Sequence, residues 1–193
     1  MKFVDTNSEY KFFKHAINRN VEPVLQSGRY LLGEKTKELE AKFSSIVGQD
    51  YSSCAVKNCT DAISIILRKE LQKGMPVIIP NFGAYPTSVA VHALTNNVHY
   101  VPVDETFTMD TSKLPADIKN GIIIPVHLFG NNCDMDSIMD YASTNNHLVI
   151  EDCAQSTGSG SGSRGNFSVF SFYPTKPLAS MGDGGMICSR EKE

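Results

Sequence analysis

The feature that most constrains the fold is an alternation of short apolar runs with longer segments of helical periodicity. Seven apolar runs are predicted as strands, at residues 54–56, 77–79, 98–101, 122–126, 148–150, 169–172 and 186–188. Three segments between them carry apolar side chains at helical spacing, at residues 61–71, 87–94 and 135–143. Strands and helices that alternate in this way predict an α/β sheet whose faces are covered by helices.

Two further helices are predicted ahead of the first strand. Residues 8–26 and residues 34–47 carry apolar side chains mostly at helical spacing, and Ser27 and Gly28 interrupt the pattern between them. On this pattern alone, both segments are interpreted as ordinary packing helices.

The size and charge of the chain narrow its class. With 193 residues, 41% of them hydrophobic, the chain can form one globular domain with a sizeable core. A net charge of −3 does not indicate a nucleic-acid partner. The five cysteines lack CxxC spacing, which favours reduced thiols. No apolar run approaches the roughly 20 residues of a bilayer crossing, and the N-terminus does not resemble a signal peptide. We therefore expect a cytoplasmic protein without nucleic-acid or membrane partners.

Polar residues follow several of the predicted strands. They are residues 58–60, residues 81–85, His127 and Asp152. In open α/β sheets, ligands bind in a crevice beyond the carboxyl ends of the strands. We therefore expect these polar groups to converge on one crevice.

The stretch from residue 149 to residue 189 places an acid and a lysine at the ends of two strands. Asp152 follows one apolar run, and Lys176 lies just past the next. A lysine amine forms a Schiff base with an aldehyde, and a carboxylate can keep a pyridinium nitrogen protonated. These two groups are the minimal equipment for binding pyridoxal phosphate (PLP). The alternative for the two residues alone is a helix-capping Asp152 and a solvated Lys176.

A longer pattern surrounds these two residues. The run EDCAQSTGS, followed by FSFYPTKPLASMGDGG, resembles the PLP-dependent nucleotide-sugar aminotransferases of the DegT/DnrJ/StrS family, whose pattern is close to EDAAQ…FSFxxTKxLxxxGDGG. The opening segment SGRYLLGEKTKELEAKFSSIVG also resembles the start of that family. The resemblance implies a three-layer α/β sandwich with a mainly parallel seven-stranded sheet, whose last strand is antiparallel. It also implies that residues 1–193 are the PLP-binding large domain and that the small C-terminal domain of the family is absent.

The resemblance assigns roles to four residues. It implies that Lys176 binds the PLP aldehyde and then moves a proton as general base and acid. It implies that Asp152 pairs with the ring nitrogen, that Ala154 lies against one face of the ring, and that Gln155 contacts the phenolic oxygen. For Gln155 alone, a polar loop residue is the alternative.

A second motif is expected to hold the phosphate. Asn58, Cys59 and Thr60 stand where the family has (S/N)GT(D/A)AL, at the start of a helix whose N–H groups attract an anion. Ser171 is expected to add a hydroxyl. The alternative is an ordinary helix cap at Asn58 or Thr60. Cys59 replaces the usual glycine, and its thiol is expected to crowd the phosphate or to force a looser loop.

Two other positions bear on the cofactor. The family commonly stacks an aromatic ring on PLP at the position of Ala84, so either Tyr85 takes over or one ring face is poorly covered; simple packing is the alternative for Tyr85. His127 lies in an HLFG segment similar to the family's HLYG and is expected to orient neighbours beside the cofactor. No His/Cys cluster has zinc spacing, so no metal is expected.

The function implied by the resemblance is transfer of an amino group to a keto-sugar nucleotide, in the biosynthesis of glycans, lipopolysaccharides or antibiotic sugars. Glutamate is the expected amino donor, and a homodimer is the expected assembly. Little turnover is expected of this chain on its own. The alternative is a catalytically inactive regulatory or interaction domain, or half of a split enzyme. A PLP-dependent sugar dehydratase is disfavoured, because such enzymes carry histidine at the position of Lys176.

Overall fold

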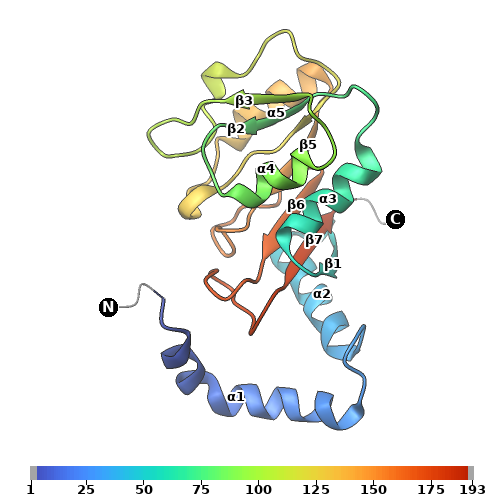
Figure 1. Ribbon diagram of the computed structural model, residues 1–193, viewed down its shortest axis with the longest axis vertical. Helices are drawn as coiled ribbons and strands as arrows, with labels where there is room; N and C mark the ends of the chain where they lie inside the picture. Colours follow the sequence, from blue (N-terminus) through green and yellow to red (C-terminus); the bar gives the residue numbers. More distant parts are fainter. Residues whose placement is uncertain (1–3, 191–193) are drawn as a thin grey trace.

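A sheet of seven strands forms the centre of the computed structural model, which describes residues 4–190 (Figure 1). Its order is β1-β7-β6-β5-β4-β2-β3, and β7 runs antiparallel to both neighbours while the other pairs are parallel. The prediction of an antiparallel last strand is therefore confirmed. The strands are β1 (Ser52–Val56), β2 (Val77–Pro80), β3 (Val98–Val101), β4 (Ile122–Ile123), β5 (Leu148–Asp152), β6 (Phe167–Ser171) and β7 (Gly185–Ser189).

The predicted helices are also present. Asn58 caps α3, because its side-chain oxygen accepts the Asp61 N–H at 2.7 Å. The fourth helix begins two residues earlier than predicted, since Pro86 is tolerated in a first helical turn. The helices are α1 (Thr6–Ser27), α2 (Glu34–Val47), α3 (Cys59–Glu70), α4 (Tyr85–His92) and α5 (Met135–Asn145), with short 3₁₀ turns η1 (Thr111–Lys113) and η2 (Leu128–Gly130).

Alternation along the strands divides the core into two faces. Ile79, Ile150 and Val169 pack with α3 and α4, whereas the intervening Ile78 and Val149 pack with α5. On the same face as α5 but farther along the sheet, Phe43 of α2 packs against Phe170 of β6. Figure 1 shows α3 and α4 in front of the sheet and α5 behind it. The arrangement is the expected three-layer sandwich.

Strand β4 is shorter than predicted. The apolar pattern predicted residues 122–126, but the ladder covers only Ile122–Ile123 and resumes as a single bridge between Val126 and Asp152. Pro125 explains the gap, because proline has no N–H to donate to a neighbouring strand. Its carbonyl still accepts the N–H of Asp152 at 2.9 Å.

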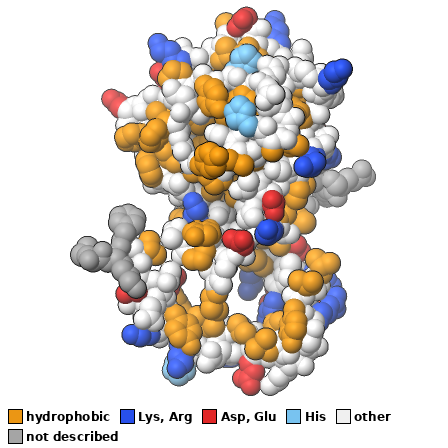
Figure 2. Space-filling model, viewed as in Figure 1, with side chains coloured by type: hydrophobic (Ala, Val, Ile, Leu, Met, Phe, Trp, Pro, Cys, Tyr) orange, Lys and Arg blue, Asp and Glu red, His pale blue; other side chains and the backbone are white. Residues whose placement is uncertain are grey.

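The first helix differs from the rest. Its 22 residues include no buried side chain, so the expectation of ordinary packing is not met within this chain. The helix extends away from the sheet (Figure 1), and hydrophobic side chains gather over this lower part of the molecule (Figure 2). None of the described helices combines the length and the apolar character needed to cross a membrane.

Candidate active site

The carboxyl ends of β1, β2, β4, β5 and β6 meet at one edge of the sheet, because these strands run in the same direction. The residues that follow them therefore approach one another, as predicted. Cys59 lies after β1, Thr87 after β2 and His127 after β4, and all three contact Asp152 at the end of β5. Asp152 is the centre of the candidate site.

The Asp152 carboxylate is buried and accepts hydrogen bonds on both oxygens. The hydroxyl of Thr87 donates to Oδ2 at 2.6 Å, and the backbone N–H of Ala154 donates to Oδ1 at 3.0 Å. The Cys59 thiol lies 3.7 Å from Oδ1, a weaker contact. The described residues thus leave one acceptor position on Oδ2, which faces the crevice side of the sheet where α3 and α4 lie.

The start of α3 is held close to the sheet by a glycine. An added Cβ at Gly185 would lie 2.7 Å from the carbonyl carbon of Asn58 and 3.0 Å from the nitrogen of Cys59. A side chain there would push the helix start away from β7. Since Asn58 caps the helix, the predicted cap is confirmed, and the N–H groups of the first turn still point out of the helix end beside Thr60.

Cys59 does not strain this loop. Among the described residues, the non-glycine positions with positive φ are Leu32, Phe107, Asn120, Phe129 and Asn146, so Cys59 needs no conformation reserved for glycine. Whether the thiol crowds the phosphate stays a prediction. Burial is the main factor that raises the pKa of the Cys59 thiol well above its usual value, and nearby Asp152 and Cys153 raise it further. The thiol is therefore a neutral donor.

Lys176 lies near the start of α3. Its backbone N–H closes a turn on the carbonyl of Tyr173 at 2.9 Å, just after β6, and its side chain is half-buried. The positive charge of Lys176 partly opposes the rise in the pKa of Cys59, so its amine lies within electrostatic reach of that thiol. Ser171, which is buried, faces the same side as Asp152 and accepts the Tyr173 N–H on its hydroxyl at 3.3 Å.

Ala154 and Gln155 continue from β5. Ala154 packs partly buried against the core beneath α3 and α4. The side-chain oxygen of Gln155 accepts the backbone N–H of Phe129 at 2.9 Å, which ties the predicted cofactor residue to η2. The structure thus gives Gln155 a fixed partner, and its contact with a phenolic oxygen stays a prediction.

Tyr85 begins α4 and is 80% exposed. It lines a hollow of about 160 Å³ together with Ala84, Thr87 and Val126. Cover of the cofactor ring by Tyr85 stays a prediction, because Tyr85 lines the hollow beside Ala84.

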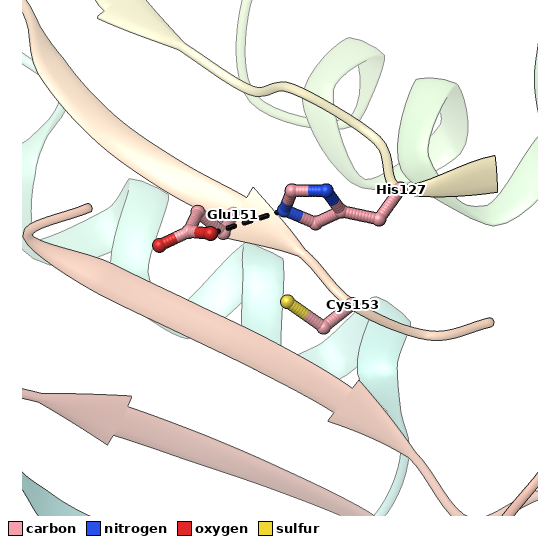
Figure 3. A group of neighbouring side chains, drawn as sticks. All are labelled: His127, Glu151 and Cys153. Carbon is pink, nitrogen blue, oxygen red and sulfur yellow. Dashed lines mark hydrogen bonds and ion pairs between the residues drawn. The ribbon is translucent and has the colours of Figure 1, made fainter. Parts of the chain in front are cut away.

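Behind β5 lies a second polar cluster, formed by His127, Glu151 and Cys153 (Figure 3). The ligand atoms of these residues lie within 4.8 Å of one another, which sequence spacing did not reveal. Nδ1 of His127 accepts the N–H of Cys133 at 3.0 Å, so Nε2 carries the proton and donates to Glu151 at 3.0 Å. Both ring nitrogens are therefore occupied by hydrogen bonds rather than available as metal ligands.

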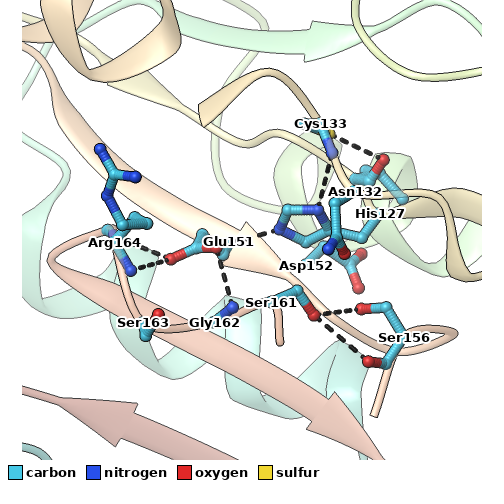
Figure 4. Close-up of polar contacts among 12 residues, drawn as sticks. His127, Asn132, Cys133, Glu151, Asp152, Ser156, Ser161, Gly162, Ser163 and Arg164 are labelled. Carbon is cyan, nitrogen blue, oxygen red and sulfur yellow. Dashed lines mark hydrogen bonds and ion pairs between the residues drawn. The ribbon is translucent and has the colours of Figure 1, made fainter. Parts of the chain in front are cut away.

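Glu151 is the hub of this cluster (Figure 4). Its carboxylate accepts His127 and the backbone N–H groups of Gly162, Arg164 and Gly165, at 2.6 to 3.0 Å. Burial pushes the pKa of Glu151 up, but the His127 and backbone hydrogen bonds outweigh it and the net pKa is lowered. The cluster fixes the Gly/Ser loop and His127, and the His127 backbone N–H in turn donates to the carbonyl of Asp152 at 3.0 Å.

Sequence reasoning missed two contributors, Thr87 and Glu151. Glu151 follows an apolar strand beside Asp152, and strand alternation could have placed it on the other face. Thr87 gives no local signal, because its partner Asp152 lies 65 residues away.

The residues present fit PLP as a ligand. Asp152 offers a buried carboxylate with an acceptor position left, the start of α3 offers an anion site, and Lys176 lies near both. At the two departures from the family pattern, the Cys59 thiol contacts Asp152 and Ala84 borders a hollow.

Known proteins are similar to this chain in sequence and fold. Residues 12–193 match the DegT/DnrJ/EryC1/StrS aminotransferase family. The chain is 37% identical, over 100% of its length and 56% of the relative's, to UDP-2-acetamido-2-deoxy-3-oxo-D-glucuronate aminotransferase of Pseudomonas aeruginosa.

Solved structures are similar to this chain in fold. A DegT/DnrJ/EryC1/StrS aminotransferase from Brucella abortus matches with a TM-score of 0.91 and 28% identity, over 100% of this chain and 56% of that one. NtdA from Bacillus subtilis, with bound cofactor PMP, matches with a TM-score of 0.86 and 27% identity, over 100% and 45%. The chain spans about half the length of the curated relatives it matches. It belongs to the DegT/DnrJ/EryC1/StrS aminotransferase family.

Proposed function

We propose that residues 1–193 are the PLP-binding domain of an aminotransferase. The observation that carries this proposal is that Asp152 and Lys176 both lie near Cys59, at the start of α3 and the carboxyl edge of the sheet. The family membership and the PMP-bound structural relative support it.

Bound PLP supplies an aldehyde carbon and an electron-withdrawing ring. The amine of Lys176 would hold the cofactor through that carbon, and its Nζ would carry the proton that moves during the reaction. The Asp152 carboxylate would pair with the ring nitrogen.

The remaining predicted residues hold the ligand in place. Backbone N–H groups at Cys59 and Thr60, with the hydroxyls of Thr60 and Ser171, bind the phosphate. Ala154 supports one face of the ring and Gln155 contacts its phenolic oxygen.

Borohydride trapping tests this assignment. PLP added to the chain should give a visible absorbance band, and reduction should leave a pyridoxyl mass on the peptide that contains Lys176. Lys176→Arg keeps the charge but should abolish the band and the mass, whereas Lys113→Arg, at an exposed site, should keep both. An unchanged spectrum of folded wild-type chain at millimolar PLP would refute the proposal.

The proposed substrate is a keto-sugar nucleotide, with glutamate as amino donor, in the biosynthesis of glycans, lipopolysaccharides or antibiotic sugars. The substrate named in the Pseudomonas aeruginosa relative supports this class. The five free cysteines support a reducing compartment such as the cytoplasm. Release of 2-oxoglutarate from glutamate, dependent on an added UDP- or dTDP-keto-sugar, measures the reaction.

A second candidate is a PLP-holding regulatory or interaction domain without turnover. The hollow beside Ala84 favours it, because Ala84 stands where the family commonly has an aromatic side chain. PLP binding without 2-oxoglutarate release, in the presence of keto-sugar nucleotides, would favour this second function over the first.

We also propose a homodimer. The side chains of Phe12, Leu31 and Leu32 are 82%, 83% and 78% exposed, and α1 buries none of its residues. A second copy would remove this apolar surface from water. Sedimentation at high protein concentration should give at least twice the chain mass, and a mass of one chain throughout would contradict the proposal.

A further inference from the structure

The hydroxyl of Thr87 makes the shortest of the three contacts to the Asp152 carboxylate. It donates to Oδ2 at 2.6 Å, and both residues are buried. A short O–H···O⁻ hydrogen bond away from water is about twice as strong as one between neutral groups. By comparison, the Cys59 thiol at 3.7 Å is a weak donor, so Thr87 dominates the side-chain contacts to this carboxylate.

Thr87 is also well placed to hold a fixed direction. It stands in the first turn of α4, and its β-branched side chain has few rotamers in a helix. The Ala154 N–H holds the other oxygen of the same carboxylate. Two donors on different oxygens fix the plane of the carboxylate, and the acceptor position left on Oδ2 then has one direction.

We propose that Thr87 is a positioning residue that aims the Asp152 carboxylate at the ring nitrogen of the cofactor. This inference rests on the proposed function. A carboxylate held in this direction keeps the ring nitrogen protonated, which makes the ring a stronger electron acceptor.

The first test needs no cofactor. A double-mutant cycle with Thr87→Val and Asp152→Asn, measured by urea unfolding of the chain, should give a coupling of about 10- to 100-fold in the unfolding equilibrium constant. Thr87→Ser should retain most of it. Thr108→Val, which removes a buried threonine hydroxyl that pairs with Thr106, should show no coupling to Asp152→Asn. If the effects of Thr87→Val and Asp152→Asn on the unfolding equilibrium simply add, the proposal is overturned.

The second test uses PLP labelled with ¹⁵N in the ring. In wild-type chain and in Thr87→Ser the ring-nitrogen shift should be that of a protonated pyridine, and in Thr87→Val it should move toward the unprotonated value, with about tenfold weaker PLP binding. A Thr87→Val chain that matches wild type in both shift and affinity would overturn the positioning role. If wild-type chain binds no PLP while the cycle shows coupling, the proposed function fails and takes the cofactor role with it, although the contact itself stands.

Discussion

Glu151 and Asp152 are consecutive residues of β5 whose buried carboxylates lie on opposite faces of the sheet. Glu151 accepts four hydrogen bonds, three of them from backbone N–H groups, and a carboxylate offers about four acceptor positions. Asp152 accepts three from the described residues, one of them from a weak thiol donor. Burial alone therefore does not distinguish the two acids, whereas the number of free acceptor positions does.

The surroundings of the two acids support the same distinction. A hollow of about 350 Å³ opens on the Glu151 side, but its Arg164 is paired with Asp136 at 2.6 Å and its His127 is bonded at both nitrogens. The hollow on the Asp152 side is smaller, at about 160 Å³, and borders the Thr87 contact. Of these two hollows, the larger one is lined by polar groups that already have hydrogen-bond or ion-pair partners.

Glu151→Gln should cause the largest loss of stability. Glutamine has one acceptor oxygen and an NH₂ group, so two of the four donors around Glu151 would face another donor. We expect the free energy of unfolding to fall by about 3–5 kcal/mol in urea titrations. Glu105→Gln, at an exposed site, should change it by less than about 0.5 kcal/mol. A loss below about 1 kcal/mol at Glu151 would remove the distinction between the two acids.

A low pH should remove the stabilisation that Glu151 provides. Because the pKa of Glu151 is lowered on folding, its stabilisation is fully present above the unfolded value of 4.5 and is lost as the pH falls through the folded pKa. The difference in unfolding free energy between wild type and Glu151→Gln should therefore be constant near neutrality and shrink below about pH 4.5. A difference that grows on acidification would show that the sign is wrong.

Gly185→Ala should loosen the Asp152 side. The new Cβ would meet backbone atoms of Asn58, Cys59 and Phe170 at 2.7 to 3.0 Å, and backbone cannot yield as a flexible side chain can. We expect a loss of about 1–3 kcal/mol in unfolding free energy and weaker PLP binding, because the start of α3 moves. Gly182→Ala, in the same glycine cluster with no atom within 4 Å, is the control. Equal effects of the two changes would contradict the role of close packing.

Features that depend on neighbouring residues can be predicted from the sequence, whereas features that depend on contacts between distant segments cannot. The seven strands, the cap at Asn58 and the pair Asp152 and Lys176 all have local or motif signals. The shortening of β4 follows from Pro125. This proline is a local signal, but the prediction of residues 122–126 rested on their apolar character instead. The Thr87 contact and the donors to Glu151 depend on how loops return to β5, and no pattern within one segment encodes that. The backbone conformation of Cys59 has no signal in the sequence either, because a helix start accepts many residue types.

Ala84→Phe should improve the cover of the ring. The hollow of about 160 Å³ has room for a side chain, and Ala84 makes no capping hydrogen bond that the change would remove. Aromatic stacking contributes about 0.5–1.5 kcal/mol beyond area burial, so PLP affinity should rise about 2- to 10-fold. Ala84→Leu fills the same space without a π face and should give less. If leucine and phenylalanine act alike, filling the hollow matters and stacking does not.

Cys59→Gly should have the smallest net effect on the protein, because a gain in phosphate binding is accompanied by a loss of folding stability. Glycine removes a thiol from the α3 start, which gives the phosphate more room and frees the second acceptor on Oδ1 of Asp152. It also costs about 0.5–1 kcal/mol of backbone entropy in the helix, with a further loss from the buried side chain. We expect the free energy of unfolding to fall by about 1 kcal/mol while PLP binds a few-fold more tightly. Cys59→Ser, which keeps a hydroxyl toward Asp152, separates the two effects: it should leave PLP affinity near wild type if contact with Asp152 matters. Tighter binding in both variants would instead assign the effect to the bulk of the sulfur atom.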